Sequence, residues 1–204
     1  MPVALDADFL LLVLDPGAKA PNDPTTQRPL DRAKERIEFL ITKLGAAKTR
    51  IVLPTPVLSE ILIRAGRAGP SYIEVLRKHS QFKIASFDER SAIECAAQLA
   101  DAKSLGDKKA GSTAPWAKVK FDRQIVAIAI VNGVQTIYSS DEDIAKYAKA
   151  RGIAVTKLWE LALPPAEQPS LPNMQPEGRV VRSDATPESG LSETAGGGND
   201  EDVE

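Results

Sequence analysis

The chain has 204 residues, a single cysteine, a single histidine and a net charge of −2. Its length fits one domain of about 150 residues with an additional segment. A lone cysteine allows no intrachain disulfide, which is typical of a reducing compartment. Asp6 and Asp8 interrupt the first apolar stretch, and no run approaches the ~20 apolar residues that span a bilayer. We therefore expect a cytoplasmic protein with no signal peptide and no membrane contact.

The charges are unevenly distributed along the chain. From Pro164 onward there are nine acidic residues and two arginines, a net charge of −7, so residues 1–163 carry +5. The same segment holds six of the fifteen prolines, a run of three glycines at 196–198 and no aromatic residue. Such a composition buries too little apolar surface to offset chain entropy. We therefore predict one folded domain over residues 1–163 and a disordered acidic tail over residues 164–204.

Short apolar runs alternate with helical patterns along the first 163 residues. The predicted strands, in chain order, are Val3–Leu5, Arg50–Leu53, Phe82–Ala85, Thr136–Tyr138 and Ile153–Val155. The predicted helices are Leu30–Leu44, Pro56–Ala65, Ser71–His79, a segment that follows a capping box at Ser86–Glu89 and ends near Leu105, Lys118–Val131, and Asp141–Arg151. This alternation predicts an α/β fold, with a parallel sheet of about five strands covered by helices.

Four acidic residues lie next to or inside apolar segments. Asp6 ends the first predicted strand, and Asp141 follows the fourth, while Glu60 and Asp122 lie in apolar helical stretches. A carboxylate on the buried stripe of a helix costs several kcal/mol unless it has a partner. Since ligands gather at the carboxyl ends of parallel strands, the four side chains can meet at one sheet edge. Oxygen ligands of this kind suit Mg²⁺ or Mn²⁺, so we predict a shared divalent metal site.

Each of these acids also has an ordinary structural interpretation. Asp6 can cap the helix that follows it, because aspartate is a favoured N-cap. Glu60 lies just beyond its apolar stripe, where a solvated side chain is equally acceptable. Asp122 and Asp141 fall in predicted first turns, where the helix macrodipole favours a negative charge by ~0.3–1 kcal/mol. The macrodipole explains an acid at these two positions but not its inward direction.

Three further residues are candidates for the same site. Asp8 lies two positions after Asp6 and can reach the same cluster. The Ser139 hydroxyl precedes Asp141 and can hold a water or a phosphate oxygen. Asp143 lies on the opposite side of its predicted helix from Asp141, which favours a solvated side chain over a metal ligand.

The four acids and their neighbours resemble, in order, the motifs of the PIN-domain nucleases, and among them the virulence-associated protein C (VapC) toxins. The matching segments are Val3–Leu11, Leu53–Ile61, Phe121–Ala129 and Ser139–Ile144. They carry the family's strand-end Asp, helix Glu, helix-start Asp and last Asp after a Thr or Ser. The resemblance thus implies catalytic and metal-binding roles for Asp6, Glu60, Asp122 and Asp141.

Two departures from the family pattern concern substrate preference. Asp8 stands where the family often has Asn, and residues 15–29 and 101–116 form longer segments than in small members. The resemblance implies a Mg²⁺- or Mn²⁺-dependent endoribonuclease that hydrolyses RNA. It also implies the role of toxin in a toxin–antitoxin pair, an antitoxin protein as partner, and a homodimer. A metal-dependent hydrolysis needs no nucleophilic side chain, which fits a chain with one histidine and one cysteine.

A basic segment leads into the stretch that holds Asp122. The candidates for RNA contact in this segment are Lys108, Lys109, Lys118, Lys120 and Arg123. Such a cluster favours electrostatic binding of phosphates. An ordinary solvated loop has the same composition, and the sequence leaves both interpretations open.

Two other functions remain as alternatives. Asp6 and Asp8 form the Asp-x-Asp pattern of haloacid-dehalogenase-like phosphatases, but Phe9 and Leu10 follow where that family has a small residue and then Thr or Val. The other alternative is a catalytically silent PIN module that binds RNA or a protein. Cleavage of phosphodiesters separates the nuclease from the phosphatase, and metal-dependent turnover separates both from the silent module.

Overall fold

The computed structural model describes residues 1–165. Apart from Pro164 and Pro165, the predicted acidic tail lies outside the described residues, and the boundary after residue 163 stays a prediction. The described part contains a sheet of five parallel strands in the order β3-β2-β1-β4-β5. In chain order these strands are β1 (Val3–Leu5), β2 (Ile51–Pro54), β3 (Phe82–Ala85), β4 (Thr136–Tyr138) and β5 (Ala154–Thr156). The predicted α/β class and parallel sheet are confirmed.

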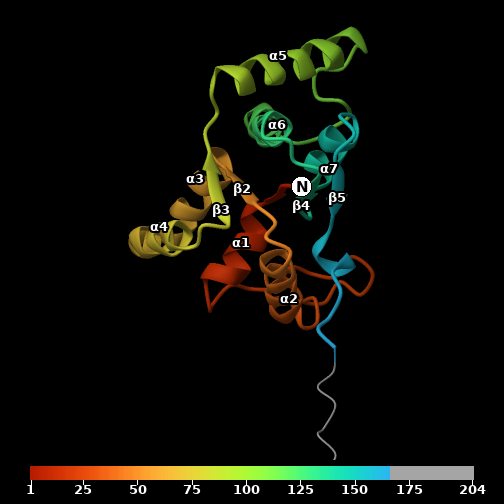
Figure 1. Ribbon diagram of the computed structural model, residues 1–204. Coiled ribbons are helices and arrows are strands. Elements are labelled where there is room, and N and C mark those ends of the chain that lie inside the picture. Colours follow the sequence, from red (N-terminus) through yellow and green to blue (C-terminus); the bar gives the residue numbers. More distant parts are fainter. Residues whose placement is uncertain (166–204) are drawn as a thin grey trace, which may run out of the picture. The chain divides into compact units, whose positions relative to one another are not determined.

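Helices cover both faces of this sheet. They are α1 (Ala7–Leu14), α2 (Ala33–Ala46), α3 (Thr55–Ala65), α4 (Gly69–Lys78), α5 (Glu89–Ser104), α6 (Trp116–Val131) and α7 (Glu142–Lys149), with 3₁₀ turns η1 (Gly66–Ala68) and η2 (Leu158–Glu160). Parallel strands need crossover connections, so α1 and α2 connect β1 to β2, and α7 connects β4 to β5 on the other side of β1 in the sheet. Figure 1 shows α1 and α2 on one side of the strands and α6 and α7 on the other. None of the described helices is both long and apolar enough to cross a membrane.

The central strands and α6 form the core because their sequences are apolar on every side. All residues of β1 and β2 are buried, as expected for strands covered on both faces. The edge strand β3 exposes Lys83. Helix α6 packs against α3, α5 and α7 as well as β2, and its side chains from Ile125 to Ala129 are buried. The second half of α6 is thus buried on all sides, whereas its first half exposes Lys118 and Lys120 and buries Asp122 and Arg123.

Most helix starts differ from the sequence predictions by one to three residues, and three of the differences change the interpretation of a side chain. Helix α6 begins at Trp116, two residues earlier than predicted, so Asp122 lies in its second turn. The macrodipole argument for an acid in the first turn therefore does not apply to Asp122. Asp141 is the N-cap of α7 rather than its first residue. The predicted capping box at Ser86 is wrong, because Asp88 is the N-cap of α5 and accepts a hydrogen bond from the Ser91 backbone nitrogen at 2.9 Å.

Candidate metal centre

The strand register places Asp6 beside Ser139 at the carboxyl end of the sheet. Leu5 pairs with Tyr138, so the next residues of β1 and β4 are neighbours. One carboxylate oxygen of Asp6 accepts the Ala7 backbone N–H at 2.7 Å, and the other accepts the Ser139 hydroxyl at 2.6 Å. The Ser139 oxygen in turn accepts the Asp141 backbone N–H at 3.1 Å. Asp6 thus caps α1, as its ordinary interpretation expects, and is also linked to the start of α7.

Asp6 is held in the protein at an electrostatic cost. Burial raises the pKa of Asp6 to about 6, although the hydrogen bonds from Ser139 and Ala7 act in the lowering direction. The negative charges of Asp8 and Glu60 raise the Asp6 pKa further. A group with such a pKa is stabilised by a nearby cation, because a cation favours the charged form.

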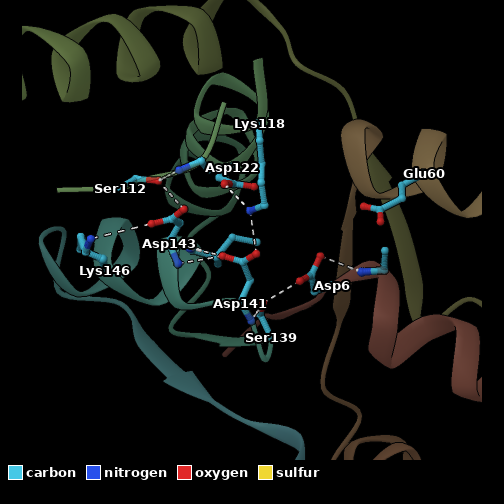
Figure 2. A network of polar contacts seen from close by, with 12 residues as sticks. Asp6, Glu60, Ser112, Lys118, Asp122, Ser139, Asp141, Asp143 and Lys146 are labelled. Atoms are coloured by element: carbon cyan, nitrogen blue, oxygen red, sulfur yellow. Dashed lines mark hydrogen bonds and ion pairs between the residues drawn. The ribbon is translucent and has the colours of Figure 1, made fainter. Parts of the chain in front are cut away.

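Asp122 and Asp141 are joined by the ammonium group of Lys118 (Figure 2). The Lys118 Nζ lies 2.8 Å from Asp122 Oδ2 and 2.7 Å from Asp141 Oδ2. The other oxygen of Asp141 caps α7, accepting the backbone N–H groups of Asp143 and Ile144 at 2.7 and 3.1 Å. Lys118 lies four residues before Asp122 on α6, so both side chains lie on the same helix face.

The two carboxyls paired with Lys118 respond differently to burial. Burial raises the pKa of Asp122 to about 6 and outweighs the lowering effect of Lys118. Burial also acts to raise the pKa of Asp141, but the Lys118 hydrogen bond and the two backbone N–H groups outweigh it, and the Asp141 pKa is lowered. The pKa of Lys118 is raised because its bonds to both carboxylates outweigh its partial burial. The cluster favours a cation between Asp122 and Asp141.

Asp143 joins this cluster from the first turn of α7. Its Oδ2 accepts the Ser112 hydroxyl at 2.6 Å, and its Oδ1 lies 3.8 Å from the Lys146 Nζ. Oxygen atoms of Asp122, Asp141 and Asp143 all lie within 4.8 Å of one another. The expectation of a solvated Asp143 is wrong, since its side chain is only 17% exposed. We call Lys118, Asp122, Asp141 and Asp143 the inner wall.

Glu60 and Asp8 lie apart from this group, on α3 and α1. Arg64 pairs with both, through Glu60 Oε1 at 2.6 Å and Asp8 Oδ1 at 3.1 Å. The three side chains are each about half exposed, at 46%, 52% and 50% for Glu60, Asp8 and Arg64. Figure 2 shows Glu60 on its own helix, separated from the three inner-wall aspartates. We call Asp8, Glu60 and Arg64 the outer wall.

The two walls face one cavity of about 590 Å³. Asp6, Glu60, Asp122 and Asp141 all line it, as does Asp8. Asp143 and Ser139 do not line the cavity. The Ser139 hydroxyl donates to Asp6, and the Asp143 backbone N–H donates to Asp141. The four acids predicted from the sequence are therefore brought to one cavity, with Asp6 between the walls.

The cavity chemistry fits a divalent cation such as Mg²⁺ or Mn²⁺. Its inner wall offers only carboxylate oxygens as ligands, which are the donors that these hard ions prefer. The Lys118 ammonium already shows that a positive charge is stabilised between Asp122 and Asp141. With Asp141 Oδ1 bonded to two backbone N–H groups, Oδ2 is the oxygen that faces a cation.

The basic segment is organised differently from the sequence expectation. Arg123 is buried, 4% exposed, and its guanidinium donates to the carbonyls of Gln98 and Lys108 at 3.1 and 3.3 Å. It also lies over the Tyr147 ring, 4.4 Å from the centroid. Arg123 is therefore not available to a phosphate, because helix packing directs it away from solvent and towards α5 and α7.

The four lysines of the segment have four different environments. Lys118 belongs to the inner wall and faces carboxylates. Lys109 donates to the Ala114 carbonyl at 2.8 Å, and Lys108 lies 5.1 Å from the centroid of the Trp116 ring. Lys120 is exposed and forms no ion pair with the described residues. Lys108, Lys109 and Lys120 remain the candidates for contact with RNA.

Comparison with known protein families identifies the chain. A family model described as "PIN domain" matches residues 30–150, more than half of the chain. The chain belongs to the PIN domain family. The matched stretch contains Glu60, Asp122 and Asp141, whereas Asp6 lies before it. Comparison with curated proteins gave no match.

Several solved structures are similar in fold to this chain. VapBC2 from Rickettsia felis, bound to a DNA fragment from its promoter, is 10% identical with a TM-score of 0.48, over 77% of this chain and 98% of that chain. DNA-bound VapBC from Salmonella typhimurium is 14% identical with a TM-score of 0.47, over 78% and 98%. VapC20 of Mycobacterium tuberculosis, a toxin that cleaves the sarcin–ricin loop, is 13% identical with a TM-score of 0.43, over 72% and 94%. At these values the likeness carries no argument about activity.

Proposed function

We propose that this protein is a metal-dependent endoribonuclease that hydrolyses RNA phosphodiester bonds. The observation that supports it most is the inner wall, where three carboxylates have oxygens within 4.8 Å of one another beside a cavity that Asp6 and Glu60 also line. Membership of the PIN domain family adds to this support. The cavity is open to the ends of the sheet where Asp6 and Asp141 follow their strands, the usual place for a ligand in a parallel sheet.

In this proposal Asp6, Glu60, Asp122 and Asp141 hold one or two Mg²⁺ or Mn²⁺ ions. A bound ion would orient the scissile phosphate, neutralise its charge and lower the pKa of an attacking water. Ser139 fixes the direction of Asp6 by donating its hydroxyl proton at 2.6 Å. Asp143 adds negative charge behind Asp122 and is fixed by Ser112. No serine, cysteine or histidine is required as a nucleophile.

The surroundings of Asp8 argue against the phosphatase alternative. In that mechanism Asp6 attacks as nucleophile and Asp8 acts as general acid. Asp8 forms an ion pair with Arg64 at 3.1 Å, so its carboxylate is engaged by a guanidinium and not directed at a leaving group beside Asp6. Both oxygens of Asp6 accept hydrogen bonds within the protein. A silent PIN module remains the alternative that activity must exclude.

The biological role within this proposal is that of a toxin paired with an antitoxin. It rests on the resemblance of the four acidic motifs to those of the VapC toxins. The antitoxin would cover the acidic cavity, and the protein would act on RNA when it is released. A homodimer belongs to the same resemblance-based proposal.

The decisive experiment measures cleavage of a fluorescent single-stranded RNA with Mg²⁺, with Mn²⁺ and with a chelator. We expect cleavage with either ion and none with the chelator. Asp122→Asn should abolish cleavage and keep the fold, because an amide of equal size replaces a carboxyl that is costly to bury. The matched control is Asp107→Asn, which removes an acid in the α5–α6 loop that does not line the cavity. Cleavage by Asp122→Asn at the wild-type rate, or hydrolysis of p-nitrophenyl phosphate instead of RNA, would contradict the proposal.

A further inference from the structure

Lys118 lies where a divalent ion would have to bind on the inner wall. Its ammonium group contacts Asp122 Oδ2 and Asp141 Oδ2, at 2.8 and 2.7 Å. These contacts place it between two of the three carboxylates whose oxygens lie within 4.8 Å. A positive charge in this position offsets the repulsion between the two aspartates.

A divalent ion and the Lys118 ammonium cannot use the same oxygens together. Asp141 Oδ1 already accepts two backbone N–H bonds of α7, which leaves Oδ2 for a cation. Ions such as Mg²⁺ bind oxygens at about 2.0–2.1 Å, so an ammonium on the same oxygens would lie almost against the ion. Two adjacent positive charges repel strongly in a partly buried site.

Lys118 has room to leave this position. Its side chain is 43% exposed, and it extends from the first turn of α6 at the rim of the cavity. Asp122, by contrast, is 7% exposed at its side chain and cannot move without repacking the core. Exchange of the cation therefore requires rotation of one flexible side chain only.

We propose that Lys118 is an internal cation that a divalent metal ion must displace, so that it sets the metal concentration at which the site fills. The inference rests on the proposed metal site and adds to it a residue that opposes metal binding. Until a metal ion binds, the lysine offsets part of the negative charge of Asp122 and Asp141.

The first test measures the affinity for Mn²⁺ by isothermal titration calorimetry. We expect Lys118→Met to bind Mn²⁺ roughly tenfold more tightly than wild type, a change of about 1.4 kcal/mol. Lys120→Met is the matched control, because it removes one exposed charge two residues away that is in no ion pair with the described residues. Equal Mn²⁺ affinities of Lys118→Met and Lys120→Met would mean that Lys118 acts only through long-range charge. That result would contradict the proposal that the metal ion displaces Lys118.

The second test needs no variant and uses the wild-type protein. Acetylation of lysines, measured by mass spectrometry in chelator and in Mn²⁺, reports whether the Lys118 amine is held by the carboxylates. We expect Mn²⁺ to increase acetylation of Lys118 several-fold and to leave Lys120 unchanged. Unchanged acetylation of Lys118 under saturating Mn²⁺ would contradict the inference even if Lys118→Met failed to fold. Absence of any Mn²⁺ binding by wild type would instead remove the proposed metal site itself.

Discussion

The two walls of the cavity carry similar charges but are built in different ways. On the inner wall each aspartate is fixed by at least one further group, namely Lys118, the α7 backbone or Ser112. On the outer wall Glu60 and Asp8 share a single exposed partner, Arg64. Buried carboxylates with fixed directions form a preorganised ligand set, whereas exposed ones can change partners at little cost. The inner wall is therefore suited to hold an ion, whereas the side chains of the outer wall can change partners when a ligand enters the cavity.

The largest expected difference between the walls is in RNA cleavage. Asp141→Asn should lower the cleavage rate by more than about 100-fold, the usual loss when a fixed electrostatic group is removed from a reaction site. The α7 cap survives because asparagine is as good an N-cap as aspartate. Glu60→Gln should cost about tenfold, as for a group that acts at the edge of a metal site. Cleavage rates are measured under single-turnover conditions. Equal reductions of the rate in both variants would contradict the proposed difference between the walls.

A difference in stability should appear when pH is varied in the presence of a chelator. The Asp122 pKa is raised from 3.8 to about 6 in the folded protein, so between these values the native state binds a proton that the unfolded chain lacks. Stability from this group is fully present below pH 3.8 and is lost as pH rises through 6. The shift corresponds to about 3 kcal/mol, at 1.36 kcal/mol per pKa unit.

Urea denaturation at pH 5 and at pH 7.5 measures this effect. Wild type should lose more unfolding free energy than Asp122→Asn between the two conditions, because the variant has no carboxyl to titrate at this position. If the free energy of unfolding changed equally with pH in the two proteins, the burial of the Asp122 carboxylate would carry no electrostatic cost.

The basic segment next to the inner wall should affect RNA binding through salt. Replacing Lys108, Lys109 and Lys120 with Ala should reduce the slope of log K against log salt by ~0.7 for each phosphate of a single-stranded RNA that is no longer neutralised. Binding is measured with Asp122→Asn as the parent, so that the RNA stays intact. Replacing Lys34, Lys43 and Lys48 serves as the control, since these three lysines lie on or just after α2 and outside the segment that leads to Asp122. Equal slopes in parent and triple variant would make the segment an ordinary solvated loop.

The smallest expected effect concerns the ion pairs of the outer wall. Arg64→Met should lower the free energy of unfolding by less than ~1 kcal/mol, because both of its carboxylate partners are about half exposed and screened by water. Thermal or urea denaturation measures this change. A larger reduction would mean that the outer wall is as firmly built as the inner one.

The positions of the acids at the sheet edge could be predicted because they depend on strand order. Asp6 and Asp141 follow β1 and β4, and parallel strands bring their carboxyl ends together wherever the two strands pair. The existence of every strand followed from short apolar runs between turn residues. Helix starts were less predictable, because α6 begins after Pro115 with no side-chain cap to mark it.

Arg123 could not be placed from its position in a run of basic residues. Successive residues on a helix point about 100° apart, so Arg123 and Asp122 face different neighbours. The signal that was available is the apolar run that follows Arg123, which indicates that this part of α6 is buried. Helical spacing also predicts that Lys118 and Asp122, four residues apart, lie on the same face and can pair. This pair was missed because Lys118 was assigned to RNA contact.

Asp143 shows what depends on tertiary contacts alone. Its side chain is drawn towards the inner wall by Ser112, which is 31 residues away in the chain. Ser112 lies in the segment between α5 and α6, where no periodicity exists from which a direction could be derived. A hydrogen bond between a loop and a helix that is distant in the sequence has no local sequence signature.

Two backbone carbonyls of the segment between α5 and α6 accept hydrogen bonds from side chains of the neighbouring helices. Arg123 donates to the Lys108 carbonyl, and the Tyr147 hydroxyl donates to the Lys109 carbonyl at 3.1 Å. These two carbonyls are present whatever side chains positions 108 and 109 carry, so the contacts with α6 and α7 do not depend on the two lysines. Lys108 and Lys109 can therefore be replaced in the RNA-binding test without removing either contact.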